Sequence, residues 1–129
     1  MLLVEPVFGG LMIDFSFSPE IEDVRLKVRA FMDEQVRPRW ESIDQNDRSA
    51  VVKAIVELRK LAQEDWKLWL PHMPVEWGGM GLGPTAMAAV SAEAAKVSIG
   101  PYVLNAQAPD ERNQHTLLHW ATPEQKEKY

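Results

Sequence analysis

The sequence predicts an all-α fold, an up-down helical bundle of about five helices. Apolar residues recur every three or four positions along most of the chain, which is the period of an amphipathic helix. Helix-start residues and segments rich in proline and glycine separate these stretches, and hardly any stretch alternates like a strand. With 129 residues, the chain has room for one domain and one hydrophobic core.

The first predicted helix begins after Ser18, which can cap it, with Pro19 in the first turn. Its apolar positions recur at helical spacing and are Ile21, Val24, Val28, Phe31 and Met32. Pro38 is expected to end this helix, because the residue before a proline avoids the α region.

The second predicted helix runs from about Ser49 to Trp66. Its buried stripe is expected to consist of Val51, Ile55, Leu58 and Leu61. Residues 71–84 follow and are dense in proline and glycine, which rules out regular structure and requires a specific turn path.

The third predicted helix runs from Pro84 to about Ser98 and is rich in alanine. Small side chains all round would let neighbouring backbones approach, so we expect this helix at the centre of the bundle. Glu93 lies within it and is expected to be an exposed or hydrogen-bonded structural carboxylate, because burying an unpaired one is costly. Gly100 and Pro101 are expected to stop the helix.

A fourth helix is predicted over residues 109–121, with an extra turn from Tyr102 as an alternative start. The last helix has Thr122 as its cap, Pro123 in its first turn and Gln125 completing a capping box. Such complete start chemistry on so short a helix favours the interpretation that the natural helix continues and that this chain is a fragment.

Residues 1–13 are interpreted as a flexible leader, with Met12 as a plausible native start. This stretch lacks the basic lead of a signal peptide and contains proline and glycine. No apolar run approaches the roughly 18 residues of a membrane span. We therefore expect a cytoplasmic protein.

Composition excludes several classes of function. The formal net charge is −5 and no basic run exceeds two residues, which argues against binding to nucleic acid. The chain has no cysteine, so it has no disulfide, thiolate metal site or cysteine nucleophile. No nucleophile elbow or supported Ser/His/Asp arrangement occurs either. The residues alone predict a helical domain without a complete active site.

Three patterns could still carry chemistry. The glycines of residues 78–83 could cradle a phosphate, but they match no phosphate-binding motif, and a turn-forming role is favoured. Glu111, His115 and His119 share one helix face and could bind a divalent metal, although a solvated or core-edge face is favoured. The five tryptophans are interpreted as core packing rather than as a stacking platform.

Three segments also carry a resemblance. They are FSFSPEIEDVRLKVRAFMDEQVRP, LWLPHMPVEWGGMGLGPTAMAAVSAEAA and ATPEQKEKY. In this order and spacing they resemble the N-terminal helical domain of the flavin-dependent acyl-CoA dehydrogenases, over Asp14 to Tyr129. Ala121 departs from the family, which usually has glycine there. The run NAQAPDERN further resembles a subgroup that includes members fused to a kinase-like domain.

The resemblance implies α,β-dehydrogenation of an acyl-CoA thioester, with FAD as cofactor and a separate electron acceptor. In that family the catalytic glutamate and the main flavin contacts lie in a middle β-domain and a C-terminal helical domain, which this chain lacks. The resemblance therefore implies that the isolated chain is inactive, binds little or no FAD and contains no catalytic residue.

By the same resemblance, this domain supplies one wall of the acyl-chain pocket. The matching positions are Leu104, Asn105 and Ala108, with Val103 and Arg112 as further candidates. Alternatively, these residues only pack the helix junction. The face that would meet the missing domains predicts self-association, so a homo-oligomer is expected. The alternative function is a non-catalytic, stand-alone helical interaction module.

Overall fold

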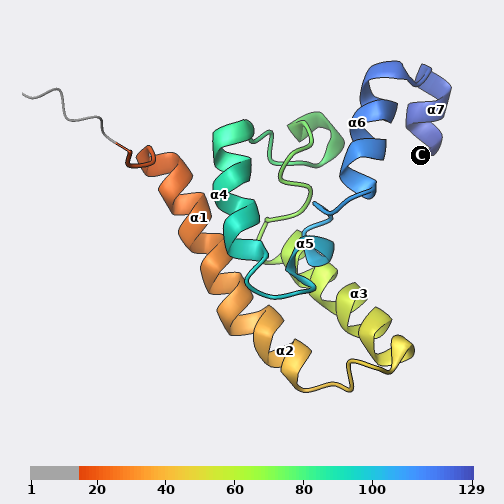
Figure 1. The fold of residues 1–129 in the computed structure, drawn as a ribbon. Coiled ribbons are helices and arrows are strands. Elements are labelled where there is room, and N and C mark those ends of the chain that lie inside the picture. The colour runs from red at the N-terminus through yellow and green to blue at the C-terminus, as the bar shows by residue number, and fades with distance from the viewer. Residues whose placement is uncertain (1–14) are drawn as a thin grey trace, which may run out of the picture.

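The computed structural model describes residues 15–129, and in that range it contains helices and no strand (Figure 1). The predicted leader, with Met12, lies outside the described residues. The α-helices are α1 (Pro19–Phe31), α2 (Arg37–Glu41), α3 (Arg48–Glu64), α4 (Pro84–Ala94), α5 (Gly100–Val103), α6 (Asp110–Trp120) and α7 (Pro123–Lys128). The predicted all-α fold class is confirmed. Within the described range, none of the helices combines the length and the apolar character that crossing a bilayer would require.

The first helix does not end at Pro38, contrary to the prediction. One π-helical turn (Met32–Val36) joins α1 to α2, and the Arg37 N–H donates to the Met32 carbonyl. In a regular α-helix a proline ring clashes with the carbonyl four residues earlier. A wider turn just before Pro38 relieves that clash, and Pro38 then occupies the first turn of α2. As a result, α1 and α2 form one rod (Figure 1).

The hydrophobic core lies where α4 packs along α1 and where α5 packs against α3. Its largest fully buried side chains include Phe31, Met32, Leu58, Leu68 and Leu104. Burial of one such side chain contributes about 1.5–3 kcal/mol. The core therefore holds α1, α3, α4 and α5 together.

The alanine-rich helix α4 is buried on one side only. Its buried residues are Ala86, Ala89, Val90, Glu93 and Ala94, whereas Ala88, Ala92 and Ala95 are exposed. The helix packs along α1 and touches α5, so the expectation of a helix at the centre of the bundle is wrong. The helix also ends at Ala94 rather than Ser98, because the chain folds back and brings Gly100 against it. A Cβ on Gly100 would lie 2.1 Å from the Ala94 carbonyl oxygen. Gly100 and Pro101 thus begin α5 instead of only stopping α4.

Helices α6 and α7 lie beside the proline- and glycine-rich segment (Figure 1). Neither helix contains a fully buried residue. The capping box of α7 is confirmed: the Gln125 N–H donates to the Thr122 hydroxyl, and the Thr122 N–H donates to the Gln125 side-chain oxygen. This end of the molecule is therefore held by local hydrogen bonds and partly buried side chains rather than by a core of its own.

The tryptophans divide between core and surface. Trp40 and Trp66 pack against the core, with the Trp66 and Phe31 ring centroids 5.2 Å apart. Trp77 is 43% exposed and Trp120 is 85% exposed. The interpretation of all five as core packing is therefore wrong for Trp77 and Trp120, neither of which belongs to the core.

Candidate functional site

The segment between α3 and α4 folds into turns that its own backbone closes. Every N–H from Gly78 to Leu82 donates to a carbonyl within residues 70–75. Gly78 and Gly81 have φ values of 79° and 65°, and a Cβ on Gly79 would lie 2.1 Å from the Met73 carbonyl oxygen. The favoured turn-forming role is confirmed. Because these N–H groups are already used, the alternative of a phosphate cradle finds no donors here.

An apolar groove of about 240 Å³ opens between this segment, α6 and α7. Its apolar lining consists of Leu70, Met73, Trp77, Leu117 and Leu118, with Tyr129 at one side. Its polar lining consists of Asn105, Gln114 and Lys126. Complete sites for small molecules usually enclose about 300–1,000 Å³, so this groove has the size of a partial site.

Two polar residues distinguish the groove from a plain apolar surface. Asn105 has a left-handed backbone, with φ at 55°, and its carbonyl lies 3.2 Å from Nε2 of His72. The Oε1 of Gln114 is buried and has no hydrogen-bond partner among the described residues. A buried acceptor of this kind is uncommon in native proteins, and it gives the groove one point for a directional contact.

The structure separates the three predicted pocket residues. Asn105 lines the groove, whereas the Leu104 side chain is fully buried in the core. Ala108 is exposed and borders two shallower surface hollows instead. Of the two further candidates, Val103 is buried in the core and Arg112 is exposed beside Ala108. Only Asn105 therefore lies where an apolar ligand could touch it in this groove.

The sequence reasoning missed the apolar side chains that form most of the groove. Leu117 and Leu118 follow Gln114 at helical spacing on α6, which is a signal that could have identified this face. Leu70 and Met73 carry no comparable pattern, because they lie in irregular turns. Their meeting with α6 depends on the three-dimensional path of residues 70–83.

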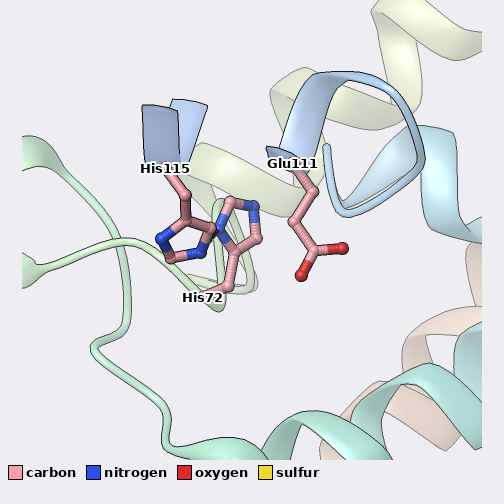
Figure 2. Close-up of side chains that lie close together, drawn as sticks. All are labelled: His72, Glu111 and His115. Carbon is pink, nitrogen blue, oxygen red and sulfur yellow. Dashed lines mark hydrogen bonds between the residues drawn. The ribbon is translucent and has the colours of Figure 1, made fainter. Parts of the chain in front are cut away.

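The face of α6 that carries Glu111 and His115 meets a histidine from the turns between α3 and α4. In the sequence, these two residues group with His119 instead. His72 joins them, with its Nδ1 3.2 Å from Nε2 of His115 (Figure 2). The ligand-type atoms of His72, Glu111 and His115 all lie within 4.8 Å of one another. His119 is exposed and only stacks its ring on that of His115, with centroids 6.4 Å apart.

The strongest electrostatic feature lies elsewhere, between α1 and α4. The buried Glu93 carboxylate accepts hydrogen bonds from Arg25, Arg29 and Lys96 at 2.5–3.1 Å. The hydrogen bonds from Arg29, opposed by burial and reinforced by those from Lys96 and Arg25, lower the pKa of Glu93 to about 2. The expectation of a hydrogen-bonded structural carboxylate is confirmed.

Comparison with known proteins gives one match. A family model described as the acyl-CoA dehydrogenase N-terminal domain matches residues 18–129, a range that includes every helix from α1 to α7. A search of curated proteins and a search of solved structures found no significant match. Because the family model covers most of the chain, the chain belongs to the acyl-CoA dehydrogenase N-terminal domain family.

Proposed function

We propose that this chain is the N-terminal domain of an FAD-dependent acyl-CoA dehydrogenase, which carries out α,β-dehydrogenation of an acyl-CoA thioester. In this proposal the domain supplies one wall of the acyl-chain pocket. The supporting observation is the groove between residues 70–77 and α6, which is mostly apolar and holds a few polar groups. That combination is typical of sites for ligands with an apolar body and a polar end.

The groove suits the tail of such a substrate better than its reacting end. Leucine and methionine side chains can cover a hydrocarbon chain, and each buried methylene contributes about 0.8 kcal/mol. The free acceptor of Gln114 would take a donor from the ligand or from a bound water molecule. Because the groove is small, the thioester would be held by surfaces that other domains provide.

The glycine-rich turn does not fit the phosphate groups of a flavin cofactor. The N–H groups of the glycine-rich turn are bound internally, and the chain is acidic, so the pyrophosphate of FAD finds no cradle in that turn. The buried carboxylate Glu93 is held by three cations and is therefore unsuited to act as a free base. In this proposal FAD and the catalytic glutamate belong to the other domains of the enzyme.

A pair of matched variants tests the groove. Leu117→Asn places a polar group in its apolar lining, whereas Val56→Asn makes the same kind of change on α3, where Val56 is 60% exposed. Titration with a medium-chain acyl-CoA, followed by NMR of the amide groups, should shift signals around Leu70, Met73 and Leu118. Leu117→Asn should weaken binding by about tenfold, since about 1.4 kcal/mol of apolar contact is lost. Equal weakening in both variants, or shifts spread over α3, would contradict the proposal.

A second measurement addresses the chemistry. The isolated chain, supplied with FAD and an acyl-CoA, should reduce no electron-accepting dye. Measurable turnover would place reacting groups within this chain and overturn the assignment to other domains. A stand-alone interaction module would also show no turnover, but it would show no binding of acyl chains in the groove.

A further inference from the structure

A buried histidine beneath α6 is oriented by the backbone. His72 is 7% exposed, and its Nε2 lies 3.2 Å from the Asn105 carbonyl oxygen. A carbonyl oxygen only accepts hydrogen bonds, so Nε2 carries the proton and donates it. The lone pair of Nδ1 is then directed at Nε2 of His115, which lies 3.2 Å away. Metal-binding histidines are commonly fixed in this way, by donating the other ring N–H to a backbone carbonyl.

The spacing of the two imidazoles matches that of ligands on one metal ion. Zinc–nitrogen bonds of 2.0–2.1 Å at a tetrahedral angle place two ligand nitrogens about 3.3 Å apart. Glu111 lies one helical turn before His115, and the three ligand-type atoms lie within 4.8 Å of one another. Figure 2 shows the rings of His72 and His115 side by side, with the Glu111 side chain extending from the same helix as His115. To enter the first coordination sphere, the Glu111 carboxylate would have to move closer to the two nitrogens by rotation of its flexible side chain.

We propose that His72, Glu111 and His115 bind a divalent transition-metal ion of the Zn²⁺ type, with solvent as the fourth ligand. Two imidazoles and one carboxylate form a set that zinc accepts in proteins. Glu111 and His115 also line a surface hollow with Ala108 and Arg112, through which solvent could reach the ion. The competing explanation is a plain hydrogen bond between the two histidines, which has no use for Glu111.

Such an ion would join two parts of the molecule that share few buried contacts. His72 belongs to the turns between α3 and α4, whereas Glu111 and His115 belong to α6, which has no fully buried residue. Binding to the folded state alone raises stability in proportion to the logarithm of the metal concentration. The ion would therefore hold α6 against the turns.

Calorimetric titration of the metal-free chain with Zn²⁺ tests the proposal. Wild type should bind one ion per chain. His115→Gln and Glu111→Gln should weaken binding by roughly 100-fold and tenfold or more, because each loses a direct ligand, and outer partners alone are worth 10–100-fold. His119→Gln is the matched control: it changes an exposed histidine one turn along the same helix and should bind like wild type within about twofold.

Several outcomes of the titration would overturn the proposal. One is the absence of saturable binding of a single ion by wild type. Another is a loss in His119→Gln as large as that in His115→Gln, which would assign binding to those two histidines. If Glu111→Gln binds like wild type, the three-residue set is wrong as well.

A second readout guards against a variant that fails to fold. Zn²⁺ should raise the thermal midpoint of wild type and of His119→Gln, and should leave that of His115→Gln unchanged. Bound Co²⁺ should show the intense visible absorption of a tetrahedral site. An equal zinc-induced rise in His115→Gln would contradict the proposal.

Discussion

Glu93 is a carboxylate that the fold keeps charged inside the protein. Its side chain is 4% exposed, and its three cationic partners are Arg25 and Arg29 from α1 and Lys96 from the turn after α4. Glu93→Gln should lower the free energy of unfolding by about 2 kcal/mol, since hydrogen bonds to charged groups are worth about 1.5–3 kcal/mol and the partners stay partly hydrated. Urea unfolding measures this change. Glu64→Gln is the control, because Glu64 is 60% exposed in a 3.9 Å pair with Lys60, and its effect should be near zero.

The same residue makes stability depend on pH in one direction. Its pKa is lowered from 4.5 to about 2 in the folded protein, so the folded state favours the charged form. This stabilisation is complete above the pKa of the unfolded chain and is lost as the pH falls from about 4.5 towards 2. Urea midpoints measured across that range should fall more steeply for wild type than for Glu93→Gln. Parallel curves would show that other carboxylates cause the acid sensitivity.

At the scale of elements, the turns after α3 depend on one glycine for space. A Cβ on Gly79 would lie 2.1 Å from the Met73 carbonyl oxygen and 2.7 Å from that of Leu70, and both atoms belong to the backbone. Gly79→Ala should therefore destabilise the chain by about 2 kcal/mol or more. Gly83→Ala is the matched control, because nothing lies within 4 Å of its Cβ and its φ is −74°. We expect a change below about 1 kcal/mol in the control, with both variants measured by urea unfolding.

Helix starts could be read from the sequence, and so could the ends of α3 and α6 to within two residues, whereas two other helix ends could not. Pro19 and Pro123 begin α1 and α7 as predicted, because a proline in the first turn requires no lost hydrogen bond. The predicted stops failed at Pro38 and at Ser98. Each of those ends depends on local geometry that helical periodicity does not show. At Pro38 a π-helical turn lets the helix continue, and after Ala94 the close packing of Gly100 ends it.

For the whole molecule, the sequence identified the class of domain but not which side chains meet. Asn105 was selected together with Leu104, yet adjacent residues in this tight turn face the groove and the core respectively. His72 and His115 are 43 positions apart and share no pattern. Their contact follows from the path of irregular turns, for which helical periodicity carries no information.

The end of the molecule formed by α6 and α7 predicts self-association. Trp120 is 85% exposed and Tyr129 is 77% exposed there, and large aromatic side chains gain most from burial between proteins. Light scattering over a range of concentrations should show wild type associating and Trp120→Ser shifted towards the monomer. Val56→Ser, a change of a 60% exposed residue on α3, should associate like wild type. A monomeric wild type at every concentration would contradict this prediction.

The π-helical turn before Pro38 also determines which side of the rod formed by α1 and α2 its later residues face. In an ideal α-helix, each step of four residues rotates a side chain by about 40° around the axis. Over the steps from Val28 through Met32 and Val36 to Trp40, that drift would carry the last residue well away from the first. The extra residue in the π-helical turn rotates the following residues in the opposite sense and offsets most of this drift. Val28 and Trp40 therefore both contact the same core. The irregularity that accommodates a proline also keeps two successive helices aligned along one seam.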